Sequence, residues 1–127
     1  METETLIRTL KGHTNRVSSS AFTYGMLFTG SKDTKIIGHD YRSHNNVVMK
    51  FQGHRGEVCG LKHDACGLAS GSNDNQAIIW DLHTAKIRYQ LLGHKAAVKA
   101  LAWCPWQRNL LATGGGSSDQ TMRFWNI

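Results

Sequence analysis

The sequence has few cysteines, no long apolar run and no N-terminal segment that resembles a signal peptide. Each of these shortages argues against one class of protein. Three cysteines are an odd number with no disulfide-framework spacing, so we expect a reducing compartment. No apolar run approaches the roughly 20 residues that span a bilayer, so we expect no membrane partner. Residues 1–10 lack the basic and apolar regions of a signal peptide. These shortages argue against a secreted or membrane-spanning protein.

Clusters of basic residues and helical periodicity are also missing. The net charge is +6 with neutral histidines, which permits contact with an acidic partner, but the Lys and Arg residues are scattered along the chain. We therefore do not expect nucleic acid as a partner. No segment shows a convincing helical period of apolar residues, so we expect almost no helix.

What the sequence does contain is an internal repeat. Gly-His recurs at residues 12–13, 53–54 and 93–94, with spacings of 41 and 40 residues. Each unit continues with a valine, a hydroxyl-glycine pair, an aspartate in a turn, and a closing His or Trp before Asp or Asn. In the second unit these landmarks are Val58, Ser70, Asp74 and Trp80. The same order three times over indicates three copies of one structural unit.

A period near 40 residues with Gly-His and Trp-Asp marks is typical of the WD-repeat blade, a small sheet of four short antiparallel strands. The sequence therefore predicts an all-β fold, a partial WD-repeat β-propeller of three four-stranded antiparallel blades in an incomplete ring. We expect one domain over residues 1–127, with repeats at about 10–41, 51–82 and 91–127.

The strand order predicts open ends. The outer strand of the last blade is expected at the N-terminus, at residues 5–10, and the chain stops after a third-type strand at residues 121–127. Three blades are too few to close a ring, because complete propellers have about 4–8. Two sheet edges and two apolar faces would then be exposed, and either a second copy of the chain (a homodimer) or missing blades from a longer chain would cover them.

Each unit also carries a trio that resembles a hydrolase triad. A catalytic site has no need to occur three times, whereas every blade must hold its turn by hydrogen bonds. We therefore predict a structural network and no enzymatic activity. Its members are His13, Thr29, Asp33, His54, Ser70, Asp74, Trp80, His94, Thr113, Asp119 and Trp125.

Two further patterns suggest cofactors only weakly. Cys59, His63 and Cys66 have a ligand-like spacing, but a structural zinc site needs a fourth ligand and none is nearby, so we favour free thiols. The glycines at 114–116 lack the spacing of a phosphate-binding loop. We predict no cofactor and no metal.

Longer strings make the assignment more specific. "GHRGEVCGLK", "LASGSNDN" and above all "WCPWQRNLLATGGGSSDQTMRFWN" resemble the fizzy and fizzy-related activators of the anaphase-promoting complex, a cell-cycle ubiquitin ligase. The resemblance runs from about Leu10 to Ile127 and covers blades similar to the third, fourth and fifth of the family's seven.

The resemblance implies a function and a site. Such proteins bind the anaphase-promoting complex and degron-bearing substrates, and they act in the nucleus and cytoplasm. Asn73 and Asn75 match family asparagines that bind a Lys-Glu-Asn degron, and Ser117 stands where the family usually has threonine. On their residues alone, the two asparagines are equally well explained as turn formers beside Asp74. An interaction scaffold that has lost ligase activation is the alternative function.

The sequence also departs from the family pattern. The ligase-docking segments and the first and last blades of the family have no counterpart in these 127 residues. The "LKHDACGLAS" stretch is shorter than usual and lacks an aromatic residue. Near the C-terminal blade, we expect Trp103 to pack in the core or between blades. Pro105 ends that strand, and we expect Trp106 in the following turn to pack against the neighbouring blade.

Overall fold

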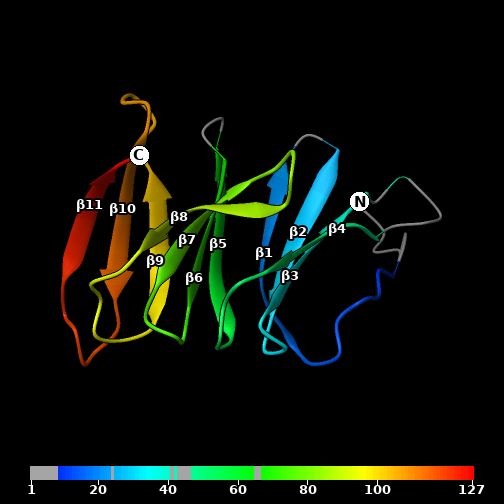
Figure 1. Cartoon of the computed structure of the whole chain (residues 1–127), viewed down its shortest axis with the longest axis horizontal. Helices are drawn as coiled ribbons and strands as arrows, with labels where there is room; N and C mark the ends of the chain where they lie inside the picture. Colours follow the sequence, from blue (N-terminus) through cyan, green and yellow to red (C-terminus); the bar gives the residue numbers. More distant parts are fainter. Residues whose placement is uncertain (1–8, 24, 41, 43–46, 65–66) are drawn as a thin grey trace, which may run out of the picture.

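A computed structural model of the chain describes residues 9–23, 25–40, 42, 47–64 and 67–127. These residues form strands, turns and loops and contain no helix, so none of them forms a helix that could cross a membrane. The strands (Figure 1) are β1 Val17–Thr23, β2 Met26–Ser31, β3 Lys35–His39, β4 Val47–Gln52, β5 Val58–Asp64, β6 Gly67–Ser72, β7 Ala77–Asp81, β8 Lys86–Leu91, β9 Val98–Trp103, β10 Leu110–Gly115 and β11 Met122–Asn126. The all-β prediction is confirmed.

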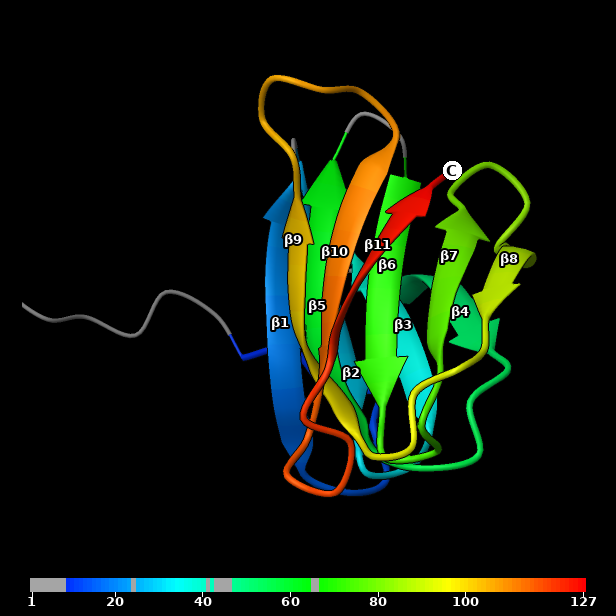
Figure 2. The same cartoon turned by 90° about the vertical axis from the view of Figure 1, so that its left-hand side faces the viewer.

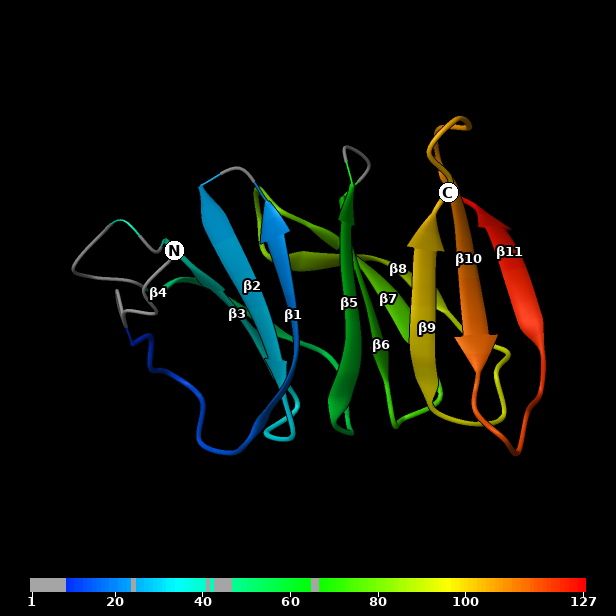
Figure 3. The same cartoon turned by 180° about the vertical axis from the view of Figure 1, so that it is seen from behind.

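The strands form three antiparallel sheets in chain order. Blade 1 is β1 to β4, blade 2 is β5 to β8, and blade 3 is β9 to β11. The blades fan out side by side, and their first strands β1, β5 and β9 lie next to one another (Figures 1 and 3). Blade 3 therefore shows three strands in the described part of the chain. Most of the outer strand predicted at residues 5–10 lies outside the described residues.

Blade 1 covers one face of blade 2 and blade 3 covers the other, because successive residues of its strands point to alternate faces. Leu68, Ile78 and Trp80 join one buried cluster with residues of blade 1, whereas Ala69 and Ile79 join a second cluster with residues of blade 3. Successive side chains of a strand point to opposite faces, so one continuous apolar run can pack against both neighbouring blades. These two clusters are the core, and they fix each blade against the next.

A glycine allows the backbones of blades 2 and 3 to approach closely. A Cβ atom on Gly71 would lie 2.1 Å from the carbonyl oxygen of Val98, much closer than any real contact. Gly30 holds the equivalent place in blade 1, where its Cβ would lie 2.6 Å from a methyl group of Val58. The hydroxyl-glycine pairs of the repeat are therefore explained in part by packing between blades.

The connections lie at two opposite edges of the blades. Turns 32–34, 73–76 and 116–121 join the second and third strands at one edge, with the Gly-His loops beside them; we call it the turn edge (lower in Figure 1). At the other edge, the loop between β9 and β10 projects beyond the sheet (Figure 2).

The two tryptophans near this projecting loop have different environments. Trp103 packs against the second cluster and donates a hydrogen bond from its indole nitrogen to the carbonyl oxygen of Lys62 at 3.3 Å, so its predicted packing is confirmed. Trp106 is 87% exposed, and the prediction that it packs against a neighbouring blade is wrong. The loop at residues 104–109, which carries Trp106, projects beyond the sheet (Figure 2).

Candidate functional site

A hydrogen-bonded chain ties the turn of blade 2 to its core. His54 Nδ1 lies 3.0 Å from Asp74 Oδ2, and Nε2 lies 2.6 Å from Ser70 Oγ. The Trp80 indole donates to the same Ser70 oxygen at 2.7 Å. If His54 is neutral, donates to Asp74 and accepts from Ser70, then each of these hydrogen-bonded side chains has a partner. The carboxylate also accepts from the backbone N–H of Arg55 and so fastens the Gly-His loop to the turn.

The other two blades repeat this arrangement with small changes. In blade 3, His94 bonds Asp119 and Thr113, and the Trp125 indole donates to Thr113 at 2.8 Å. In blade 1, where a histidine replaces the tryptophan, the hydrogen-bonded residues are His13, Asp33, Thr29 and His39. The histidine ring of each trio is enclosed, with no more than 5% of its side chain exposed. Such enclosed rings suit side chains that hold the turns by hydrogen bonds.

Burial and hydrogen bonding shift the pKa values of these groups in a consistent way. Burial lowers the pKa of His54 below its usual value, against the opposing effect of Asp74. Burial alone would raise the pKa of Asp74, but the N–H of Arg55 and the proximity of His54 hold it below the ordinary range. The Thr121 hydroxyl and His94 lower the pKa of Asp119 to about 2. The folded state therefore favours neutral His54 and ionised aspartates at neutral pH.

These shifts predict that acid destabilises the fold. The unfolded chain protonates His54 at a higher pH than the folded chain does, so stability falls as pH drops through about 6.5. The depressed pKa values of Asp74 and Asp119 extend the loss below about pH 4. Thermal unfolding between pH 7.5 and 5.5 is expected to show a falling Tm, with a shallower slope in His54→Gln. A Tm that stays constant or rises over this range would contradict the assignment.

The predicted peptide-binding asparagines lie in the turn between β6 and β7. The backbone N–H of Asn73 donates to the carbonyl oxygen of Glu57 at 2.9 Å, and that of Asn75 donates to Ser72 at 3.2 Å. Asn75 has a φ of +70°, a conformation that asparagine tolerates better than most residues. Both residues are exposed. Their backbones are thus fixed at the turn edge, as the turn-former explanation requires, and they stay open to a ligand.

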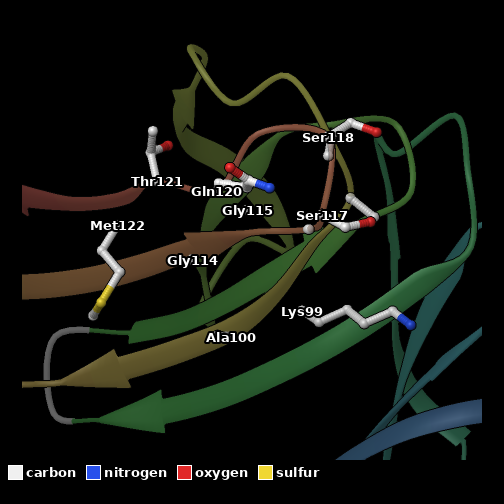
Figure 4. A pocket seen from close by; sticks show the side chains of 12 residues that line it. Lys99, Ala100, Gly114, Gly115, Ser117, Ser118, Gln120, Thr121 and Met122 are labelled. Carbon is white, nitrogen blue, oxygen red and sulfur yellow. The ribbon is translucent and has the colours of Figure 1, made fainter.

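Ser117 lies in the turn between β10 and β11, at the same edge. It lines a hollow of about 550 Å³ together with the three glycines, Met122 and Lys99 (Figure 4). A second hollow of about 490 Å³ is lined by Lys99, Asn73 and Cys59, with the paired side chains of Arg16 and Glu57. Lys99 borders both hollows and so joins the surroundings of Ser117 to those of Asn73. From the sequence, Lys95 and Lys99 only add positive charge near a loop and form no motif, so the place of Lys99 between two hollows could not be predicted.

The metal-like pattern does not assemble in the described part of the chain. Cys59 donates to the carbonyl oxygen of Val98 on blade 3, whereas the His63 ring stacks on Phe28 of blade 1. A bulge between Val58 and Gly60 shifts the register in β5. Cys66 lies outside the described residues. The described residues hold no group of three potential metal ligands.

Comparison with known proteins supports the sequence-based resemblance. Residues 4–40, 45–81 and 85–126 match the family "WD domain, G-beta repeat". The chain is 50% identical over 125 residues to the anaphase-promoting complex subunit cdc20 of Dictyostelium discoideum, covering 94% of this chain and 25% of that protein. It is 46% identical over 128 residues to the WD repeat-containing protein slp1 of Schizosaccharomyces pombe, covering 99% and 26%.

Solved structures agree on the fold. A chain in the crystal structure of the mitotic checkpoint complex superposes with a TM-score of 0.90 at 47% identity, covering 94% of this chain and 38% of that one. The structure of U3-55K gives a TM-score of 0.84 at 25% identity, covering 94% and 38%. The chain spans about a quarter of the length of the curated relatives described above. The resemblance to fizzy-type proteins is confirmed, and the chain belongs to the WD domain, G-beta repeat family.

Proposed function

We propose that the chain is the degron-reading part of a substrate-recognition subunit of the anaphase-promoting complex, and that it acts by binding and not as an enzyme. Its similarity to the Dictyostelium subunit, 50% identity over 94% of this chain, supports the assignment to that complex. Because the chain spans only about a quarter of the length of such relatives, we propose peptide recognition for it and do not propose ligase activation.

The two hollows at the turn edge, which share Lys99, carry the proposal. One is lined by Asn73 and the other by Ser117 and Gly114, so amide, hydroxyl and ammonium groups border one surface. These groups can meet the functional groups of an extended peptide: an amide pairs with the peptide's asparagine or main chain, and the ammonium pairs with its glutamate. The glycines, which have no Cβ atom, would let the peptide backbone come close.

Titration of a fluorescent peptide that contains Lys-Glu-Asn tests the proposal. Asn73→Ala is expected to weaken binding at least about tenfold, because one or two hydrogen bonds to the peptide would be lost. At Asn75 we choose glycine, since its φ of +70° would strain an alanine. Gln107→Ala removes an exposed amide at the opposite edge and is the matched control.

Two results would reject the peptide site. A folded wild-type chain that binds the peptide no better than a scrambled version would favour the scaffold alternative. Equal weakening by Gln107→Ala and Asn73→Ala would show that binding does not depend on the turn edge. The placement in the nucleus and cytoplasm stays a prediction that follows from the same proposal.

A further inference from the structure

The acidic residues of the turn edge are enclosed or paired. Its described loops and turns contain four of them. Three are the trio aspartates Asp33, Asp74 and Asp119, whose side chains are no more than 7% exposed. The fourth, Glu57, is 10% exposed and accepts hydrogen bonds from Nε and Nη2 of Arg16, each at 3.0 Å. Their negative charges are therefore compensated by groups of the chain itself and are poorly placed to meet a ligand.

Basic side chains of the same edge are exposed. Each trio aspartate accepts a hydrogen bond from the backbone N–H that follows the Gly-His pair, and in blades 2 and 3 that N–H belongs to Arg55 and Lys95. The side chains of these two residues stay in solvent, as do those of Lys32 and Lys99. We call these four residues the cationic rim. None of them forms an ion pair within the described residues, so the rim presents uncompensated positive charge.

The cationic rim adjoins the two hollows of the turn edge. Lys99 borders both of them. The backbone N–H of Arg55 is bonded to Asp74, in the turn that also carries the two asparagines. Lys95 directly precedes two alanines that line the larger hollow. Because a motif of three residues spans at most about 10 Å, the residues before and after it would lie along this rim.

We propose that the cationic rim selects degrons in which acidic residues flank the Lys-Glu-Asn motif. This inference rests on the proposed function and adds the charge of the flanking residues to it. Complementary charges around a binding site contribute specificity and faster association. An acidic peptide fits the edge better than a nucleic acid, because the described loops and turns of this edge contain no Phe, Tyr or Trp on which bases could stack.

Fluorescence anisotropy of the whole chain with three labelled Lys-Glu-Asn peptides tests the inference. The motif is flanked by Asp and Glu in the first peptide, by Gly and Ser in the second, and by Lys and Arg in the third. At about 50 mM salt, the acidic peptide is expected to bind about tenfold more tightly than the neutral one, and the basic peptide more weakly than both. At about 500 mM salt, the acidic advantage should fall to about twofold or less, because salt screens exposed charges.

Two rim variants and one matched control locate the effect. Arg55→Gln and Lys95→Gln are each expected to lower the ratio of acidic-peptide to neutral-peptide affinity from about tenfold to about threefold, since each removes one exposed cation. Arg108→Gln removes an exposed guanidinium from the projecting loop at the opposite edge and should keep the full ratio. An equal decrease in all three variants would show that net charge, and not the rim, sets the preference.

The remaining outcomes separate this inference from the proposed function. Equal affinity for the acidic and neutral peptides would overturn the inference and leave the peptide site in place. An acidic peptide with a scrambled motif that binds as tightly as the intact one would instead reject recognition of the motif, and the preference for acidic residues would stand. A single-stranded DNA oligonucleotide that binds as tightly as the acidic peptide would overturn the choice of a peptide. If none of the peptides binds, both proposals are wrong.

Discussion

Gly71→Ala is expected to lower the free energy of unfolding by about 3 kcal/mol, because it forces a methyl group into a backbone atom. The new Cβ would lie 2.1 Å from the Val98 carbonyl oxygen and 3.0 Å from a Val98 methyl group. Val98 is part of the β9–β10 ladder, so it cannot retreat without disturbing blade 3. Since small domains are stable by only about 5–15 kcal/mol, the Tm in thermal unfolding should fall sharply.

Gly114→Ala is the matched control for this prediction. It makes the same chemical change at the equivalent strand position, but its Cβ would meet only Ala100. We expect a loss below about 1 kcal/mol when unfolding is followed at a concentration where the chain is monomeric. Equal losses for Gly71→Ala and Gly114→Ala would show that the cost comes from the strand and not from the junction between blades.

His54→Ala is expected to cost about 2–3 kcal/mol of stability. The histidine side chain is fully enclosed and joins Asp74 to Ser70, so its removal leaves a cavity and a buried hydroxyl with one partner fewer. Chemical denaturation of the variant and the wild type measures the loss.

His83→Ala is the control for His54→Ala, because it removes an exposed histidine from the same blade, and it should change stability by less than about 0.5 kcal/mol. A hydrolase activity that disappeared in His54→Ala while stability stayed unchanged would contradict the structural role of the trio.

Repetition made much of the fold predictable from the sequence. A single His, Ser and Asp in blade 2 would have been consistent with catalysis, but the same trio at three equivalent positions indicated a structural element. The structure shows His54 enclosed between Asp74 and Ser70, in hydrogen-bonding distance of both. The period near 40 residues, with its Gly-His and Trp-Asp marks, also predicted blades of short strands such as β7, in which both faces are buried.

Features that depend on local backbone geometry could not be predicted. The bulge in β5 directs Cys59 toward blade 3 and His63 toward blade 1, and no residue pattern signals it. Tryptophan is usually buried, and this general tendency gave the wrong result for Trp106, which a longer loop carries into solvent. The hollows that share Lys99 depend on how neighbouring blades meet, which a single repeat does not specify.

The claim that the turn edge binds a degron is tested most directly by nuclear magnetic resonance of the wild-type chain during titration with the Lys-Glu-Asn peptide. We expect the side-chain amide signals of Asn73 and Asn75 to shift together and saturate, while the amide signal of Gln107 at the opposite edge stays unchanged. Saturable binding that leaves both asparagine amides unmoved would place the peptide elsewhere and contradict the account.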